Sequence, residues 1–277
     1  MIANIKNREK DSIEVMNENL MKRPLISIIT VCLNAENFIE QCMQSVLTQE
    51  FDDYEYIVID GGSFDGTTNI IKKYQHQLVY WHSKPDRGLA HAFNQGIQNS
   101  RGQWLIFLNS DDFFSNVSVL EKMADSLRCY PEKDVIFGQI IMVSRESVPD
   151  FIGGPYGKPF DWWRFVLVND VLPHPAAATN RDLFERIGLF SEEMSISLDH
   201  EIYLRAGQTL RAKFIKLQVT SMRVGGMSTL NIRESLRHSH LARVATRTLP
   251  LPISYLLYYY RFSRAVIGRA ILKILKL

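Results

Sequence analysis

The sequence has few cysteines, and their placement excludes two common ways of stabilising a small fold. Among 277 residues there are three, Cys32, Cys42 and Cys129, which are odd in number and widely spaced. No CxxC pair occurs, so neither a zinc ribbon nor a disulfide framework is available. This usage fits a reducing compartment best, and we expect a cytoplasmic protein.

Long hydrophobic segments are also missing. Residues 1–23 mix charges of both signs and lack the apolar stretch of a signal peptide, so we interpret them as a loose lead-in. The longest apolar run, residues 249–260, contains two prolines and is too short to span a bilayer. The sequence therefore predicts neither a secretory leader nor a transmembrane helix.

Acidic residues are absent from the end of the chain. The whole sequence has 32 Lys and Arg against 30 Asp and Glu, yet from Ser235 onward there are eight basic residues and no acidic one. The first 234 residues thus hold 24 basic and 30 acidic groups, a net charge of −6. An acidic body argues against a nucleic-acid partner, whereas the basic end suggests contact with an anionic surface.

The hydrophobic pattern predicts an α/β fold built on a mainly parallel, doubly wound sheet. Up to residue 150, buried-strand patterns and helical patterns alternate about five times. Beyond residue 150 the alternation breaks up without a clear linker, so we predict one domain over residues 24–230 and a C-terminal extension over 231–277. The expected strands cover residues 25–33, 54–62, 78–83, 103–112 and 134–143, and the expected helices cover 35–48, 66–74, 89–99 and 117–128.

Polar side chains gather where the expected strands end, which is where such sheets bind ligands. Asp60 lies at the end of the second strand, before GGSFDGT at 61–67, which has the glycine spacing of a phosphate loop but Thr67 in place of the required lysine. Asp65 would also repel phosphates, and no GxGxxG follows any strand. Asp60 and Asp65 could instead accept hydrogen bonds from a base or ribose; alternatively, Asp65 caps the helix that starts at Gly66.

The sequence NSDD at residues 109–112 directly follows the fourth apolar strand. Two adjacent carboxylates, Asp111 and Asp112, are costly at a strand end unless they are solvated or bound to a cation. Mg²⁺ and Mn²⁺ prefer oxygen ligands and leave positions open for phosphate oxygens, so we predict a metal site that holds a diphosphate. The alternative is a helix N-cap, with Asp112 as the cap and Asp111 on the metal.

Two residues of the second half of the chain are further candidates. Asp199 precedes a helical pattern, where a carboxylate could serve as a general base or as a cap. His174 lies in the proline-bracketed turn LPHPAA, where a lone histidine is more often structural than catalytic. No GxSxG or Cys–His signature of a hydrolase occurs.

Taken together, the motifs form an ordered set. TVCLN, VIDGGSFDGT, SKPDRGLAHAFNQG, GQWLIFLNSDD, LPHPAA, RIGLFSEEMSISLDHEIYLRA and VGGMST follow one another along the chain. In this order the chain resembles the inverting family 2 glycosyltransferases of bacterial surface-polysaccharide assembly, over residues 24 to about 230. The resemblance implies a GT-A fold, a single nucleotide-binding α/β/α domain that transfers a sugar from a nucleoside diphosphate to an acceptor hydroxyl.

The resemblance also implies a role for each matching residue. Asp111 would bind Mg²⁺ or Mn²⁺, which neutralises the diphosphate leaving group, and Asp199 would be the catalytic base of a direct, inverting displacement. A UDP-sugar is the favoured donor, and a lipid-linked saccharide is the expected acceptor. The nucleotide-sugar would contact Thr30, Asn34, Asp60, Asp65, Asp86, Arg87, Gly88, Asn94, Asp111 and His174.

Several positions depart from the family pattern. Asn109 stands where many relatives have the first Asp of a DxD motif, which makes the metal site one charge weaker. His91 stands where relatives often have Asp, and Gln95 where Lys or Arg is common, and both changes bear on sugar selectivity. His174 is followed by Pro175 rather than by the usual Gln.

Two other functions fit parts of the pattern. A sugar nucleotidyltransferase would usually have a Gly-rich loop with Arg or Lys after the first strand, where this chain has the acidic NAENF. A non-catalytic nucleotide-sugar-binding or assembly protein would still use Asp60 and Asp111 but would not need Asp199. An assay of donor hydrolysis in the presence of metal separates the binding protein from the enzyme.

Residues 261–277 have the pattern of a basic amphipathic helix. Tyrosines at positions 255 and 258–260 precede it, and a basic amphipathic helix with flanking aromatics is typical of a membrane surface. We expect this tail to dock on anionic lipid at the inner face of the cell membrane; the alternative is a helix packed on the protein's own core. The residues on the basic half of the helical wheel are Arg261, Arg264, Arg269, Lys273 and Lys276.

Overall fold

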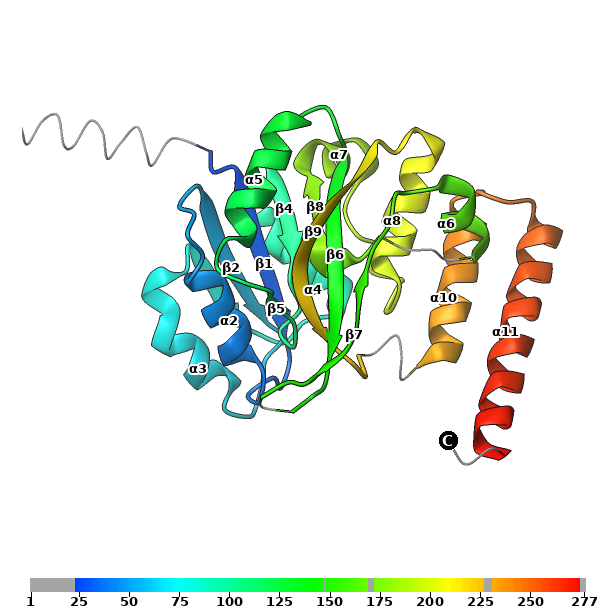
Figure 1. Cartoon of the computed structure of the whole chain (residues 1–277), viewed down its shortest axis with the longest axis horizontal. Helices are drawn as coiled ribbons and strands as arrows, with labels where there is room; N and C mark the ends of the chain where they lie inside the picture. Colours follow the sequence, from blue (N-terminus) through cyan, green and yellow to red (C-terminus); the bar gives the residue numbers. More distant parts are fainter. Residues whose placement is uncertain (1–22, 147, 169–171, 227–230, 275–277) are drawn as a thin grey trace, which may run out of the picture.

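The computed structural model describes residues 23–274 apart from 147, 169–171 and 227–230. Residues 1–22, most of the predicted lead-in, lie outside this description. Within it, nine strands form one sheet in the order β3-β2-β1-β4-β8-β6-β9-β5, with β7 paired to β6 (Figure 1). The strands are β1 (Ile26–Cys32), β2 (Tyr54–Asp60), β3 (Tyr80–Ser83), β4 (Trp104–Phe107), β5 (Phe113–Phe114), β6 (Val135–Val143), β7 (Phe151–Tyr156), β8 (Ala177–Asn180) and β9 (Ala212–Arg223).

One half of the sheet is the parallel unit that the sequence predicts. β3, β2, β1 and β4 are parallel neighbours, and every residue of β1 and β4 is buried. Burial on both faces explains why these segments are unbroken apolar runs. β2 and β4 end earlier than expected, at Asp60 and Phe107, because the polar residues that follow belong to loops.

The other half of the sheet is mixed. β8 is antiparallel to both β4 and β6, β9 runs parallel to β6, and β5 is antiparallel to β9. β7, β8 and β9 follow residue 150, where the sequence pattern predicted no strand. The pairing of β6 with β9 shifts register around Gly138, where an added Cβ would lie 2.4 Å from the main-chain oxygen of Leu217. The close approach of the two backbones therefore requires a glycine.

Helices cover both faces of the sheet and enclose a core on each side. α2, α3 and α5 pack on one face, and α4, α6, α7 and α8 pack on the other. The helix expected from residue 35 begins four residues later, because residues 35–38 form a turn. The bounds are α2 (Ile39–Leu47), α3 (Thr67–Tyr74), α4 (Leu89–Gln98), α5 (Val119–Cys129), α6 (Trp162–Val168), α7 (Arg181–Ile187) and α8 (Leu198–Ala206), with 3₁₀ turns η1 (Gln75–Gln77), η2 (His174–Ala176) and η3 (Gly207–Thr209).

The C-terminal segment folds back onto the body of the protein. α10 (Ile232–Ala245) packs against α8, and its Ala242 belongs to the same core cluster as Leu198 and Ile202 of that helix. α11 (Leu251–Ile274) packs against α10 and forms the outer layer on this side (Figure 1). Residues 232–245, which the predicted boundary groups with the tail, thus contribute to the core through Ala242. Among the described residues, no helix is both long and apolar enough to cross a membrane.

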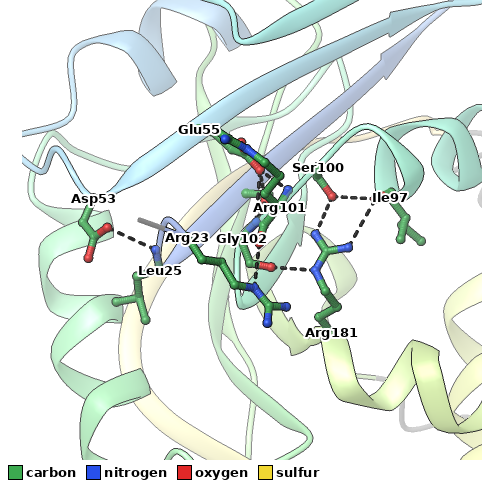
Figure 2. A network of polar contacts seen from close by, with 10 residues as sticks. Arg23, Leu25, Asp53, Glu55, Ile97, Ser100, Arg101, Gly102 and Arg181 are labelled. Carbon is green, nitrogen blue, oxygen red and sulfur yellow. Dashed lines mark hydrogen bonds and ion pairs between the residues drawn. The ribbon is translucent and has the colours of Figure 1, made fainter. Parts of the chain in front are cut away.

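A polar network joins the elements where β1, β2 and β4 begin (Figure 2). The buried Glu55 carboxylate accepts hydrogen bonds from Ser27 Oγ at 2.7 Å, from Gly102 N at 3.0 Å and from Arg101 N. Arg181, the first residue of α7, donates to the oxygen of Gly102 at 2.8 Å and to Ser100 Oγ at 2.6 Å. A Cβ on Gly102 would lie 2.5 Å from Ser27 N. This end of the sheet is therefore closed by packing and hydrogen bonds.

Candidate active site

The carboxyl ends of the parallel strands meet at the opposite edge of the sheet. Cys32, Asp60 and Ser83, the last residues of β1, β2 and β3, lie side by side in register. The loops that follow these strands carry several residues that the sequence predicts as nucleotide-sugar contacts: Asn34 after β1, Asp65 after β2, and Asp86, Arg87 and Gly88 after β3. Residues 109–112 follow the neighbouring strand β4, so the two predicted parts of the site lie on one edge.

Asp60 is fully buried at this edge, and four donors hold its carboxylate. Oδ2 accepts hydrogen bonds from Ser83 Oγ at 2.6 Å and from Ser63 N at 2.9 Å. Oδ1 accepts from Ser63 Oγ at 2.5 Å and from Cys32 Sγ at 3.5 Å. A ligand that donates to Asp60 would therefore replace one of the serine hydroxyls, since a carboxylate has about four acceptor positions.

Asn34 and Asp65 hold the two loops next to Asp60 against each other. Asn34 has a left-handed backbone, with a φ of 52°, and its Oδ1 accepts a hydrogen bond from Phe64 N at 3.1 Å. Asp65 accepts from Thr67 N at 3.0 Å and from Glu36 N at 3.2 Å. The helix begins at Thr67, one residue later than predicted, and its N-cap residue is Gly66. Asp65 therefore supports the first turn through Thr67 N without being the N-cap residue of the capping alternative.

Thr30, a predicted nucleotide-sugar contact, does not extend its side chain to the carboxyl edge of the sheet. The residue is fully buried in the middle of β1. Its hydroxyl accepts a hydrogen bond from Tyr56 OH at 3.0 Å and lies 3.8 Å from Cys42 Sγ of α2. Thr30 thus supports the strands beneath the site, and its burial argues against a direct contact with a nucleotide.

The loop before α4 carries Asp86, Arg87 and Gly88. Asp86 Oδ1 accepts a hydrogen bond from Gly88 N at 2.8 Å, and Gly88 adopts a φ of 114°, which a glycine tolerates. A Cβ on Gly61 would lie 2.6 Å from Asp86 Oδ2, so this loop closes tightly on the loop after β2. Arg87 is exposed and forms a bidentate ion pair with Glu192, through Nε at 2.9 Å and Nη2 at 3.1 Å.

The residues of α4 that depart from the family pattern contact each other. Gln95 Nε2 lies 3.3 Å from His91 Nε2, one helical turn away. Asn94 on the same helix is buried, and both ends of its amide bond the main chain of Phe190. These two bonds tie Asn94 of α4 to the loop before α8.

Asp112 does not cap a helix, which corrects one of the alternatives. The following helix, α5, begins at Val119, and the short strand β5 lies between them. Asp112 is buried and accepts hydrogen bonds from Arg223 N at 3.1 Å and from Asn109 Nδ2 at 3.0 Å. Burial, and then the neighbouring charge of Asp111, raise the pKa of Asp112 well above the usual carboxyl value. Asp112 thus ties the loop to the end of β9.

Asp111 is the accessible carboxylate of the pair, and two arginines lie beside it. Its side chain is 27% exposed and pairs with Arg145 Nη1 at 3.0 Å, while its main-chain oxygen accepts from Arg223 Nη1 at 2.6 Å. Both guanidinium groups lie over the ring of Phe38, at 4.6 Å for Arg145 and 4.9 Å for Arg223. Arg223 also donates to Gln41 of α2. The edge near Asp111 therefore carries positive charge suited to a phosphate group.

The oxygen ligands at Asp111 fit a divalent cation whose remaining coordination positions a diphosphate would fill. Among the described residues, no group of three or more His, Cys, Asp or Glu side chains converges on one point. Asp111 offers one hard, partly exposed carboxylate, whereas both oxygens of Asp112 are engaged. Mg²⁺ is commonly bound in this way, through one or two carboxylates with phosphate oxygens and water in the remaining positions.

Asp199 lies in the first turn of α8, beside His174. No hydrogen bond to its carboxylate is present within the described part of the chain, so it does not cap the helix, whose N-cap residue is Ser197. Asp199 is close enough to His174 to raise the pKa of that ring, although burial has the larger effect and lowers the pKa overall. His174 stacks on Phe107, the last residue of β4, with ring centroids 5.1 Å apart. His174 therefore packs on the strand that leads to Asp111 and lies within electrostatic range of Asp199.

Sequence reasoning missed Arg145 and Arg223. Arg145 lies in the turn between β6 and β7, more than 30 residues after Asp111. Arg223 is the last residue of β9, more than 110 residues after Asp111. No local motif marks either arginine. The signal that could have found them is the paired acidic residues themselves, since buried or half-buried carboxylates require cationic or hydrogen-bonding partners.

A curled, mainly parallel sheet between two helical layers, with acidic residues at the carboxyl edge, defines a glycosyltransferase of the GT-A fold. The sequence profile of Glycosyl transferase family 2 matches residues 27–188, more than half of the chain. The chain is therefore a member of glycosyltransferase family 2, and the predicted family and fold are confirmed.

Curated relatives agree with this assignment. An uncharacterised glycosyltransferase of Mycobacterium tuberculosis is 32% identical over 184 residues, which cover 66% of this chain and 69% of the relative. A glycosyltransferase of PGL/p-HBAD biosynthesis from Mycobacterium bovis is 28% identical over 214 residues, which cover 75% of this chain and 80% of the relative.

Solved structures share the fold. TarS of S. aureus (residues 1–349), in complex with UDP, superposes with a TM-score of 0.58 at 19% identity and covers 84% of this chain and 69% of its own. The mannosyltransferase PcManGT of Pyrobaculum calidifontis, in complex with GDP-Man and Mn²⁺, gives a TM-score of 0.61 at 19% identity, with 86% and 69% covered. At this identity the two structures support the architecture alone.

Proposed function

We propose that this enzyme transfers a sugar from a nucleoside diphosphate to an acceptor hydroxyl with inversion at the anomeric carbon, in the assembly of a cell-surface glycan. The observation that carries the proposal is the position of β4. The last residue of this strand stacks on His174, whose ring is close enough to Asp199 to respond to its charge, and the loop that follows holds Asp111. A candidate base and a candidate diphosphate site therefore lie on either side of one strand end.

The proposed reaction is a single displacement. The carboxylate of Asp199 accepts the proton of the acceptor hydroxyl while that oxygen forms a bond to the anomeric carbon. The bond between the anomeric carbon and the diphosphate oxygen breaks, and its electron pair leaves with the nucleoside diphosphate. Asp111 would hold a divalent cation, which would supply charge neutralisation for this leaving group. Arg223, fixed beside Asp111, adds positive charge at the same place.

The carboxyl edge of the sheet and the similar proteins together support a nucleoside-diphosphate sugar as the donor. Solved neighbours are named as complexes with UDP, UDP-GlcNAc and GDP-Man, and one curated relative is named for PGL biosynthesis. We favour a UDP-sugar as the donor and Mg²⁺ or Mn²⁺ as the metal. The nucleotide would lie on the loops that Asn34, Asp60 and Asp65 organise, and the sugar would lie toward Asp86, Arg87 and Gly88.

The proposed acceptor is a lipid-linked saccharide at an anionic membrane surface. Large apolar side chains on the outer side of α11 are exposed, among them Leu256 at 72%, Tyr259 at 60% and Tyr260 at 57%. Arg264 of the same helix is exposed beside them. Side chains beyond residue 265, on which most of the predicted wheel depends, lie outside the described residues. Exposed tyrosines with basic neighbours suit the headgroup region of a bilayer.

One experiment tests both the activity and its mechanism. A panel of UDP- and GDP-sugars is screened for thermal stabilisation of the protein with Mn²⁺; a ligand at 100 times its Kd should stabilise by about 2.7 kcal/mol. The best donor is then incubated with enzyme and a saccharide acceptor, and the product anomer is assigned by NMR. An inverted product is expected. A retained anomer would overturn the mechanism, and binding without transfer or donor hydrolysis would favour a non-catalytic binding protein.

A further inference from the structure

The ion pair between Asp111 and Arg145 occupies the carboxylate that the proposed function assigns to the metal. Arg145 Nη1 lies 3.0 Å from Asp111 Oδ2 and 3.5 Å from the main-chain oxygen of Val224. A divalent cation needs a lone pair of the same carboxylate and would meet the positive guanidinium at short range. Cation binding at Asp111 and the ion pair therefore compete.

The two arginines at this position differ in their freedom to move. Arg223 is 2% exposed and is held by Asp111 O, by Gln41 and by the ring of Phe113 at 5.1 Å. Arg145 is 41% exposed and lies in the turn between β6 and β7. It makes the two contacts above and rests on the face of Phe38. A long, half-exposed side chain with one ion pair can leave Asp111 at small cost, whereas Arg223 cannot.

We propose that Arg145 is a positioning residue that exchanges partners when the donor binds: it leaves the carboxylate of Asp111 to the divalent cation and pairs with the diphosphate of the donor. The inference rests on the proposed function, because it requires that Asp111 hold the metal. Its consequence is a thermodynamic coupling. The cation binds weakly alone, since it must displace Arg145, and the cation and nucleoside diphosphate bind together more tightly than either does separately.

The test compares Arg145→Ala with the wild-type protein in two binding measurements. Mn²⁺ affinity is measured by EPR titration without nucleotide, and UDP and GDP affinity is measured by calorimetry in saturating Mn²⁺. We expect Mn²⁺ alone to bind about two- to fivefold tighter to the variant, the range for a partly exposed ion pair. We expect the nucleoside diphosphate to bind about tenfold weaker or more, because a charge-assisted contact is lost.

Two further variants keep the outcomes separate. Arg237, exposed and paired with Glu234 at 3.1 Å on α10, provides the control: Arg237→Ala should change neither affinity. Asp111→Asn should abolish Mn²⁺ binding. If it does, and Arg145→Ala fails either to tighten Mn²⁺ or to weaken the nucleoside diphosphate, the exchange is wrong while the metal assignment stands. If Asp111→Asn binds Mn²⁺ as the wild type does, the metal assignment itself is wrong and the exchange falls with it.

Discussion

Asn94 and Phe190 exchange a pair of hydrogen bonds across 96 residues of sequence. Asn94 Nδ2 donates to the oxygen of Phe190 at 2.9 Å, and Phe190 N donates to Asn94 Oδ1 at 3.0 Å. The pair ties α4 to the loop that leads into α8, the helix that carries Asp199. Asn94, which the family resemblance places near the donor, supports this loop in the structure.

Replacing Asn94 should therefore lower stability before it alters donor recognition. Asn94→Ala leaves two buried main-chain groups of Phe190 without partners, which costs roughly 2–4 kcal/mol. Urea unfolding measures this loss. Asn99→Ala serves as the control, since Asn99 is exposed and bonds only the main chain of its own helix. Equal stability of the two variants would show that the contact with Phe190 contributes little.

The two adjacent aspartates should respond differently to the same substitution. Asp111→Asn should abolish metal-dependent binding of the nucleoside diphosphate, because it removes the accessible carboxylate. Asp112→Asn should cost less, since Asp112 is buried and bonded to Arg223 N and Asn109 rather than open to a ligand. Calorimetry with and without Mn²⁺ separates the cases. Unchanged Mn²⁺-dependent binding in the Asp111 variant would sink the metal assignment.

Asp199→Asn should keep donor binding and lose transfer. General-base catalysis typically contributes about 10²-fold or more to the rate, and the carboxamide cannot accept the proton. The turnover number and the donor Kd are measured in parallel. Glu193→Gln, an exposed neighbour in the loop before α8, is the matched control and should be near normal. Near-normal turnover of the folded Asp199 variant would show that another residue takes the proton.

Acid should destabilise the protein partly through His200. Its ring is buried, and burial, followed by the charge of Arg243, lowers its pKa to about 3. Since the unfolded chain takes up a proton near pH 6.5 and the folded state does not, stability present above that pH is lost as the pH falls.

The size of this effect follows from linkage. Between pH 7 and pH 5, wild-type protein should lose roughly 1–2 kcal/mol of unfolding free energy that His200→Phe retains. Urea unfolding at the two pH values measures the difference. His76→Gln, at an exposed position, should lose stability with acid as the wild type does. An identical pH dependence in His200→Phe would mean that His200 does not contribute.

The membrane proposal is tested on the whole chain. Wild-type protein should sediment with anionic liposomes at low salt and be released at high salt, since each basic residue near anionic lipid contributes about 1 kcal/mol that salt screens. Leu256→Asp should weaken sedimentation, because Leu256 is exposed on α11. A chain ending at Arg247 keeps α10 and should still bind the donor. Wild-type protein that ignores anionic liposomes at low salt would show that α11 serves only to cover α10.

Local patterns were sufficient to predict the parallel half of the fold and much of the site edge. β1, β2 and β4 are buried on both faces, so their composition alone marks them as strands. Asp60 and Asp111 could be predicted at the carboxyl edge because the polar residues at strand ends are adjacent in sequence to those strands.

Long-range partners could not be predicted in the same way. β9 was missed because only its second half is mostly buried, so its apolar pattern is weak. The role of Asp112 depends on Arg223, 111 residues away, and that of Asn94 depends on Phe190. Thr30 matches a family position, but its side chain points toward Tyr56 and α2, which only the three-dimensional strand orientation reveals.

The network around Glu55 and Gly102 also bears on how such an enzyme can change its substrate. It joins β1, β2, the entry to β4 and the start of α7 at the end of the sheet opposite the carboxyl edge. Loops at the carboxyl edge can therefore be exchanged, lengthened or changed in sequence without disturbing the hydrogen bonds that hold the strands together at the opposite end. If the proposed function holds, grafting the segment of residues 84–88 or 144–150 from a relative with another donor should alter the sugar specificity.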